Sequence, residues 1–348
     1  MRVESFSGSP AEWDEFVRTA PGATHCHLHG WRTVMERVFG HECLYYAARD
    51  EHGALAAVLP LVRVRSMLFG HYVVSMPFLN YGGPIGTPAG VQALASHVAR
   101  SAEGETGELG KAKLVELRSR IALPIDISVS HRKITVLLDL PESGGAALWH
   151  SLPAKLRSQI RRPQKEGIAV RFGADQVEPF FAVFAQHMRD LGTPTQSRQL
   201  FECIAEIFPD DVWFGCAYYG DQAVAAGCGF SWGGEFEMTW ASALRRFNRY
   251  SPNMLLYWSF LERAATQRLA TFNFGRCTPG GATHRFKRQW GSRDVPLWWY
   301  QLTPSGSGGA VATPAPDRGA LALGPLVWRH LPVALATALG PRIVRYLP

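Results

Sequence analysis

The sequence predicts an α/β protein with mixed sheets, partly α+β in character, organised as two domains of similar architecture. Three observations support this expectation. The chain has 348 residues, enough for two domains of about 150 residues each. Hydrophobic residues make up 47% of it and charged residues 19%, so a buried core is expected rather than disorder. An order of helix, strands, helix and two strands also appears in the first half and recurs in outline in the second.

The first domain is expected to span residues 1–150. Apolar periodicity and turn signals predict helices at 11–19, 31–39 and 92–103, and strands at 43–49, 55–64, 71–76, 113–118 and 133–140. Pro10 lies near the start of the first helix and Gly40 follows the second, as is common at helix boundaries. This order of elements is typical of a mixed sheet.

The second domain is expected to span residues 151–303. The predicted elements are helices at 152–164, 176–190, 198–208 and 252–268, and strands at 168–172, 212–219, 223–232, 235–243, 270–274 and 295–302. The three strands between 212 and 243 are expected to form a meander with glycine turns. Pro163 removes a hydrogen bond from the first helix, which is therefore expected to kink or end near Arg162.

Residues 304–348 are expected to lie outside both domains. The segment is rich in Pro, Gly, Ser and Ala up to Gly319, which is typical of a linker. From Ala320 onward the chain is apolar and contains three arginines and no acidic residue. Such a tail either docks on the body of the protein or makes peripheral contact with a membrane surface.

Bulk charge and cysteine usage narrow the class of protein. The 36 Lys and Arg residues against 29 Asp and Glu give a net charge of +7, which favours anionic small molecules or membrane surfaces over dedicated nucleic-acid binding. The six cysteines show no CxxC spacing, which favours a reducing compartment. The first residues lack an apolar signal-peptide region, and no stretch of about 18 apolar residues occurs, so we expect a cytoplasmic protein.

Three histidines, His25, His27 and His29, alternate shortly after the first helix. In an extended segment they would share one face, as zinc ligands do. No carboxylate or other fourth ligand lies close by in the sequence. We therefore expect a polar loop before the next helix and no metal site.

The stretch FNFGRCTPGGATHRFKRQW, residues 272–290, concentrates the candidate chemistry. A short apolar strand ends at Gly275, and a loop rich in Gly and Pro follows, where the backbone can approach a ligand closely. Its basic side chains are Arg276, Arg285, Lys287 and Arg288. In an extended segment Arg285 and Lys287 would share one face. Such a cluster suits an anionic ligand or a developing oxyanion, and the alternative is a solvated basic turn.

Two further segments are candidates for substrate contact. The loop 77–88 is rich in Gly, Pro and aromatic residues, and Tyr81, Gly82 and Gly83 are its candidate substrate-facing residues. The alternative is a structural turn that packs its aromatic rings. The helix at 152–164 carries four basic residues and no acid, so Lys155 and Arg161 are candidates for phosphate contact. A solvated helix face is the alternative there.

The motif FNFGR…TPGGATHRFKRQWG resembles the closing motif of the FemAB-like peptidyltransferases, and more narrowly the FemAB-related proteins associated with PEP-CTERM (exosortase) systems. The family pattern is a strand ending in Asp-Phe-Gly, a loop, Tyr-Arg-Phe-Lys and an aromatic-Gly pair. This chain keeps Arg-Phe-Lys at 285–287 and Trp-Gly at 290–291, but has Asn273 for the acid and His284 for the tyrosine. The basic helix and the Tyr-Gly-Gly-Pro element at 81–84 also fit the family.

The resemblance implies a double GNAT-type acyltransferase fold and an enzyme. Family members transfer an aminoacyl group from aminoacyl-tRNA to an amine on a cell-wall precursor. By this likeness Lys287 lies near the reacting carbonyl and stabilises the oxyanion, while Arg276, Arg285 and Lys155 bind anionic parts of the substrates. Asn273 joins the substrate-binding set, and no separate general base is visible.

The same resemblance implies a set of partners and a location. They are a nucleotide-linked or lipid-linked envelope precursor, related to peptidoglycan or exopolysaccharide, and aminoacyl-tRNA or acyl-CoA as donor, with no cofactor. The location is the cytoplasm, at the inner face of the membrane if the tail binds it.

Three alternatives stay open at this point. The first is an acyl-CoA-dependent N-acetyltransferase of the GNAT class, whose Arg/Gln-x-x-Gly-x-Gly/Ala loop binds pyrophosphate; RCTPGGA, residues 276–282, differs from it by one residue in spacing. The second is a non-catalytic protein that binds a polymer precursor. The third is a transferase with Cys277 as nucleophile and His284 as its partner.

Overall fold

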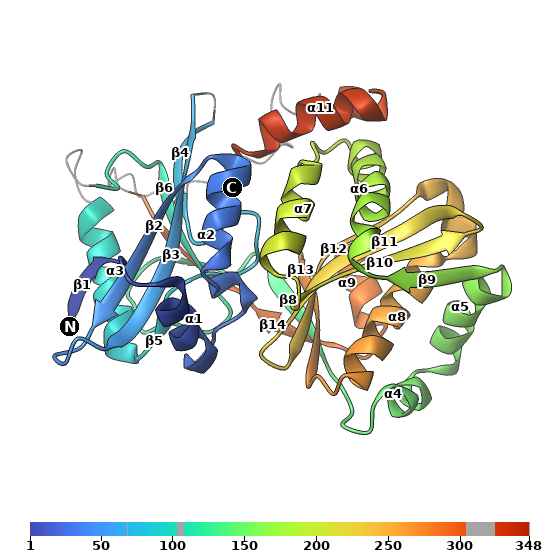
Figure 1. Ribbon diagram of the computed structural model, residues 1–348, viewed down its shortest axis with the longest axis horizontal. Coiled ribbons are helices and arrows are strands. Elements are labelled where there is room, and N and C mark those ends of the chain that lie inside the picture. The colour runs from blue at the N-terminus through green and yellow to red at the C-terminus, as the bar shows by residue number, and fades with distance from the viewer. Residues whose placement is uncertain (68, 103–107, 304–323, 348) are drawn as a thin grey trace. The chain divides into compact units, whose positions relative to one another are not determined.

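The computed structural model describes residues 1–67, 69–102, 108–303 and 324–347 (Figure 1). Within these ranges the chain forms two compact units. The first comprises Met1–Ile134 together with residues 296–303 and 345–347, and the second comprises Thr135–Val295 together with residues 324–344. The chain therefore leaves the first unit near residue 134, earlier than the expected boundary at 150, and returns to it near residue 296.

The first unit consists of one sheet and the helices that cover it. Its elements are β1 (Arg2–Ser5), α1 (Pro10–Thr19), η1 (His25–His27), α2 (Gly30–Val34), η2 (Met35–Phe39), β2 (Glu42–Arg49), β3 (Leu55–Ser66), β4 (Gly70–Val74), β5 (Ile85–Gly86), α3 (Pro88–Ala102), β6 (Leu114–Ser119), β7 (Val129–Ser130) and β15 (Trp298–Leu302). The strand order is β1-β2-β3-β4-β6-β15-β7, with β5 paired to β3. The sheet is mixed, because β4 and β6 are parallel while β2 and β3 are antiparallel.

Strand β15 corrects one expectation. The sequence placed residues 295–302 as the last strand of the second domain, but β15 pairs antiparallel with β6 and β7 of the first sheet. Its Tyr300 belongs to the core of this sheet, with Leu117 as its register partner on β6. Burial of these apolar side chains gives the strand its place there, and periodicity along the chain carries no information about which sheet a strand joins.

Helices cover both faces of the first sheet. On β2 the neighbouring residues Tyr45 and Tyr46 point to opposite faces, as successive strand residues do. The Tyr45 ring packs on Trp13 of α1 at 4.8 Å between centroids, and the Tyr46 ring packs on His97 of α3 at 4.9 Å. Helices α1 and α3 therefore lie on opposite sides of β2. Helix α1 begins where the Ser9 side chain accepts a hydrogen bond from the Glu12 N–H, a capping interaction.

The second unit has a sheet of its own and a larger set of helices. Its elements are β8 (Ile134–Asp139), α4 (Gly145–Ser151), α5 (Ala154–Lys165), β9 (Ile168–Phe172), η3 (Ala174–Gln176), α6 (Val177–Leu191), α7 (Arg198–Ile207), β10 (Val212–Tyr219), β11 (Gln222–Trp232), β12 (Glu235–Ala243), η4 (Arg245–Tyr250), α8 (Pro252–Thr266), β13 (Thr271–Cys277), α9 (Ala282–Arg288), β14 (Arg293–Pro296), α10 (Gly324–Trp328) and α11 (Val333–Val344). The strand order is β14-β8-β13-β12-β11-β10-β9. The predicted meander of β10, β11 and β12 is confirmed, and β13 adds to it in parallel with β12.

The two long helices α6 and α8 lie on either side of β10 and β11 (Figure 1). Phe214 of β10 packs its ring on Phe180 of α6, 5.4 Å between centroids. The next residue, Gly215, points to the other face, where an added Cβ would lie 2.9 Å from the Phe260 ring of α8. An added Cβ at Gly227, the register partner of Gly215 on β11, would also lie 2.9 Å from the Phe260 ring. Two paired glycines therefore let α8 approach the sheet closely.

The basic helix at the start of this unit differs from expectation. Helix α5 runs from Ala154 to Lys165 and continues through Pro163, so it does not end near Arg162. The Pro163 ring is buried, and the Glu166 N–H still donates to the Arg162 carbonyl. Burial of the ring offsets the hydrogen bond that proline cannot make.

The tail docks on the second unit. Helix α11 packs against α6, and a Cβ at Gly340 would lie 2.8 Å from backbone atoms of Thr195. An Arg189 guanidinium N–H of α6 donates to the Leu331 carbonyl at 3.2 Å. The expected linker, residues 304–319, lies outside the described residues. Across the described ranges no helix is both long enough and apolar enough to cross a membrane.

Candidate functional site

The basic stretch folds as a strand, a tight turn and a short helix. Strand β13 continues to Cys277, two residues beyond its expected end at Gly275, whose φ of +73° favours glycine. Residues Ala282–Arg288 form helix α9, so the expectation of extended backbone, with Arg285 and Lys287 on one face, is wrong. Residues two apart in a helix point about 200° from each other. Arg285 is accordingly exposed, and Lys287 points inward.

Lys287 is a buried cation held by backbone oxygens. Its side chain is 4% exposed, and its Nζ donates to the carbonyls of Gly275 at 2.8 Å and Arg276 at 3.0 Å. Burial lowers the pKa of Lys287 to about 8, and the nearby Cys277 and, to a smaller extent, Glu237 partly oppose this shift. An ammonium group has three N–H donors. The third donor of Lys287 has no acceptor among the described residues, so it is available to an incoming oxygen.

Asn273 shapes the turn that holds Lys287. It is completely buried on β13, and its Oδ1 accepts hydrogen bonds from the Thr135 hydroxyl at 2.7 Å and the Gly275 N–H at 2.8 Å. Its Nδ2 donates to Glu235 Oε1 at 2.9 Å. These contacts engage the amide within the fold, so Asn273 orients the Gly275 carbonyl that receives Lys287 and offers little to a substrate directly.

The loop before α9 is clasped by two side chains of that helix. The Gly280 N–H donates to Nδ1 of His284 at 3.0 Å, and Arg285 donates to the Gly280 carbonyl at 2.7 Å. Since Nδ1 must be unprotonated to accept this bond, the ring proton is on Nε2, 3.0 Å from both oxygens of Asp294. His284 and Arg285 thus fix the loop position, and the exposed Arg285 stays at the surface.

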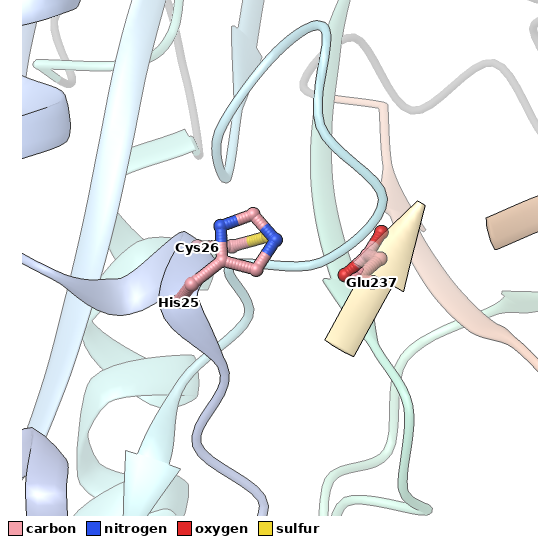
Figure 2. Close-up of side chains that lie close together, drawn as sticks. All are labelled: His25, Cys26 and Glu237. Atoms are coloured by element: carbon pink, nitrogen blue, oxygen red, sulfur yellow. The ribbon is translucent and has the colours of Figure 1, made fainter. Parts of the chain in front are cut away.

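Two site residues were missed by sequence reasoning. Ser292 is buried and its hydroxyl donates to the Lys287 carbonyl at 2.8 Å, which ties the end of α9 in place. Glu237 is a buried acid on β12 (Figure 2). Its register partner on β13 is Asn273. Glu235 and Glu237 alternate along a largely apolar strand and therefore share one face. That pair of acids in an apolar strand is the sequence signal by which Glu237 could have been found.

Tyr81, Gly82 and Gly83 belong to the first unit and serve its packing. Tyr81 is 1% exposed, and Gly82 has a φ of +126°. The Gly83 N–H donates to the Arg118 carbonyl at 2.6 Å, and the Gly83 carbonyl lies 3.0 Å from Nε2 of His27. Both backbone groups of Gly83 are therefore engaged within the unit, which favours the alternative of a structural turn over direct substrate contact.

The histidine segment is a 3-10 turn, so its side chains do not alternate on one face as an extended segment would require. His27 accepts a hydrogen bond from the Thr24 N–H at 3.0 Å, and burial lowers the pKa of His27 to about 4. Cys26 Sγ lies 3.6 Å from Nε2 of the neighbouring His25 (Figure 2). Both ring nitrogens of His27 are used within the fold, the second by Gly83. We therefore assign His27 a structural role.

Lys155 and Arg161 are not brought near Lys287. Helix α5 packs on α8 and on β9, the edge strand of the sheet, whereas Lys287 contacts β13. Strands β9 and β13 are four places apart in the strand order, which corresponds to about 19 Å. Both side chains are exposed, and the Arg161 guanidinium lies over the Trp149 ring at 5.1 Å.

Residues 151–288, which include β12, β13 and α9, match a family model described as an acetyltransferase (GNAT) domain. No curated protein sequence gives a match. The strand, helix and turn that hold Lys287 all fall within the matched residues, so the site lies in the part of the chain that resembles this domain.

Solved structures extend the likeness to nearly the whole chain. FemX is similar with a TM-score of 0.64 at 13% identity, covering 87% of this chain and 98% of its own. The C-terminal domain of a putative lysylphosphatidylglycerol synthetase from Agrobacterium fabrum gives 0.55 at 12% identity, covering 86% and 92%. A tandem GNAT protein from the clavulanic acid biosynthesis pathway gives 0.51 at 11% identity, covering 88% and 100%. At these identities the likeness concerns the fold, and the predicted tandem GNAT-like fold is confirmed. Together with the domain match it supports an acyltransferase.

Proposed function

We propose that this protein transfers an acyl or aminoacyl group to an amine on an anionic cell-envelope precursor, with Lys287 stabilising the oxyanion of the transition state. The observation that carries the proposal is the third donor of the Lys287 ammonium. Two N–H groups are held by the Gly275 and Arg276 carbonyls, so the remaining one is fixed in direction before substrate arrives. A donor that needs no reorganisation during the reaction lowers the barrier most effectively.

Glu237 is our candidate for the group that takes the proton from the acceptor amine. It is a buried acid, and it is the carboxylate whose charge favours the protonated form of Lys287. In the attack of an amine on an ester carbonyl, a carboxylate can accept the proton of the amine while an ammonium stabilises the oxyanion of the carbonyl. Glu237→Gln is accordingly expected to lower the turnover with little change in substrate binding.

The remaining basic residues would contact anionic parts of the substrates. Arg276 and Arg285 lie on the two segments that meet at Lys287, so we assign them to the part of a substrate nearest the reacting carbonyl. Lys155 and Arg161, on α5, would reach only a remote part of a long substrate. Tyr81 and Gly82 keep a supporting role through the fold of the first unit.

The nature of donor and acceptor follows from the FemAB resemblance of residues 272–291. It favours aminoacyl-tRNA as donor and a nucleotide-linked or lipid-linked precursor as acceptor. One structural neighbour is described as a putative lysylphosphatidylglycerol synthetase, a name that joins an aminoacyl group to a lipid, and this supports the choice. The narrower likeness to PEP-CTERM-associated proteins leads us to include exopolysaccharide precursors, and exosortase genes beside this one would support that choice.

An acyl-CoA-dependent N-acetyltransferase is the second candidate, and the description of the matching family model favours it. Two experiments distinguish this candidate from our proposal. The first measures the thermal stabilisation of the protein by acetyl-CoA and by a UDP-linked muropeptide, and the second measures transfer from acetyl-CoA and from aminoacyl-tRNA. Stabilisation by the muropeptide and transfer from aminoacyl-tRNA would support our proposal. Stabilisation and transfer with acetyl-CoA alone would replace it.

Lys287→Ala tests the catalytic role. Loss of one fixed oxyanion donor typically lowers the rate by about a hundredfold or more. The matched control is Thr283→Ala on the same helix, where the side chain is exposed and the rate should not change. Equal rates for Lys287→Ala and the control would remove Lys287 from the mechanism.

The tail gives a reason to place the protein at the inner face of the membrane. Leu335 and Leu339 of α11 are 44% and 37% exposed, and the exposed Arg342 continues their stripe at i+7. An apolar stripe ending in a cation suits peripheral binding to anionic lipid. Sedimentation with vesicles containing phosphatidylglycerol should fall for Leu335→Glu/Leu339→Glu and stay unchanged for Ile121→Glu, another exposed apolar site, which is 42% exposed. No sedimentation of the wild type would exclude membrane contact.

A further inference from the structure

The second unit contains a cavity that the proposed reaction does not use. Its volume is about 370 Å³, within the range of small-molecule sites. It lies where β9 ends and β10 begins, and the last turns of α8 and the loop after α7 complete its wall. None of the residues that line it belongs to β13 or α9, the elements that hold Lys287.

A clamped arginine forms one side of this cavity. The Arg263 guanidinium of α8 lies 4.9 Å from the centre of the Phe172 ring and 4.8 Å from that of the Trp213 ring. All three residues line the cavity. Two aromatic contacts hold the cation in place and add cation–π stabilisation. The guanidinium is therefore fixed before any ligand binds.

Arg263 lacks the acceptors that an arginine normally has. In the described part of the chain it makes no hydrogen bond and no ion pair through its side chain, and its Nε is buried without a partner. Buried polar groups are nearly always satisfied, so an unsatisfied guanidinium nitrogen calls for a ligand or water. With rings packed on the cation, the N–H groups along its edge are the part left for an acceptor.

Its surroundings define the chemistry of that acceptor. Gln267 caps the C-terminal end of α8, four residues after Arg263, and lines the same cavity, so its amide adds a neutral donor. A planar guanidinium edge matches two oxygens of a carboxylate or phosphate. The one acid of the lining, Asp210, comes from the loop after α7 and is exposed. The oxyanion is thus placed at the α8 wall, and the rings of Phe172 and Trp213 meet the apolar part of the ligand.

We infer that this cavity is a binding site for a small organic oxyanion, a carboxylate or a phosphate ester with a flat apolar body, and that Arg263 is its anchor. The site is independent of acyl transfer at Lys287.

The test is calorimetric titration of the full chain with four probes: benzoate, phenyl phosphate, inorganic phosphate and the neutral benzamide. We expect benzoate or phenyl phosphate to bind at least about tenfold more tightly than benzamide, since only the anions use the guanidinium edge. The ratio of the benzoate and phenyl phosphate affinities shows whether the site prefers a carboxylate or a phosphate ester. Tighter binding of phenyl phosphate than of inorganic phosphate would show that the apolar wall contributes. No binding of either aromatic anion at millimolar concentration would overturn the inference.

Variants connect the binding to Arg263. Arg263→Gln should weaken anion binding by about tenfold or more. Arg263→Gln also removes the contacts of the guanidinium with Phe172 and Trp213, so a second variant is needed. Gln267→Glu, at an exposed position, keeps these contacts and places a negative charge beside them. It should weaken anions and leave benzamide unchanged. Arg268→Gln, outside the lining, is the matched control. Unchanged anion affinity in both Arg263→Gln and Gln267→Glu would refute the assignment.

Discussion

The charge of Lys287 sets the pH dependence that we expect for acyl transfer. Burial lowers its pKa from the ordinary 10.5 to about 8, so the side chain changes from cation to neutral amine within an accessible range. If the cation stabilises the oxyanion, the Lys287-dependent part of the rate falls as pH rises through about 8, by about tenfold per pH unit above it. The measurement is the transfer rate under kcat/KM conditions from pH 6.5 to 10, with melting curves at each pH.

Lys287→Arg provides the internal comparison. Arginine stays charged throughout this range, so its rate should lack the alkaline fall, although its planar fork reproduces the two carbonyl contacts poorly and lowers the rate at neutral pH. Dividing the wild-type rate by the Lys287→Arg rate at each pH cancels the titration of the acceptor amine. A ratio that does not change across pH 8 would refute the role of the charge. A ratio that rises with pH would show that neutral Lys287 acts as a base.

The same pKa predicts a change in stability whose sign can be checked. Between the folded pKa of about 8 and the unfolded value of 10.5, the unfolded chain binds the proton and the folded chain does not, so stability increases with pH across that window. The gain relative to Lys287→Met is about 3 kcal/mol in total, at about 1.4 kcal/mol per unit. Denaturant unfolding of both proteins at pH 7 and pH 10.5 measures it. Parallel stability curves would mean that Lys287 keeps its ordinary pKa.

Three further changes probe the supports of the site and the tail. Asn273→Asp removes the N–H donor to Glu235 and places two carboxylates together, so it should lower the free energy of unfolding by about 2–4 kcal/mol. Adding Glu235→Gln should restore much of this stability in urea titrations. Absence of that rescue would contradict the contact between residues 273 and 235. Gly83→Ala brings a Cβ within 2.7 Å of a backbone oxygen and should cost about 1–3 kcal/mol; an unchanged melting temperature would show that the loop yields. Gly340→Leu should detach α11, because a Cβ there lies 2.8 Å from Thr195; limited proteolysis would reveal it, and equal cleavage rates would mean that the tail does not depend on this contact.

The local elements were largely predictable from the sequence, and the pairing of distant strands was not. Periodicity and turn residues are local signals, so the meander of β10 to β12 and the helices beside it were expected correctly. Strand β15 was placed in the wrong sheet, because its choice between the two depends on which apolar surface it completes. The helix end expected near Arg162 is absent for a related reason, since burial of the Pro163 ring offsets the local cost of the proline.

At the site, residue types were easier to predict than geometry. Lys287, Arg276 and Arg285 occur in a recognisable basic segment. The helical backbone of α9 turns Lys287 inward and Arg285 outward, whereas the expected extended backbone would place both on one face. The oxygens that hold Lys287 are backbone carbonyls, and these leave no signature in a sequence. Arg263 went unnoticed because its aromatic partners lie on β9 and β10, far away along the chain.

The return of β15 to the first sheet affects how the chain can assemble during synthesis. Domains generally form in the order in which they leave the ribosome. Here the strand that lies between β6 and β7 is made only after residues 135–295, so the first sheet stays open until residue 302 has been translated. The body of the second unit is continuous over those residues and can close earlier. In vectorial synthesis the body of the second unit would close before the first sheet that precedes it, and pulse proteolysis of stalled chains of increasing length would reveal this reversed order.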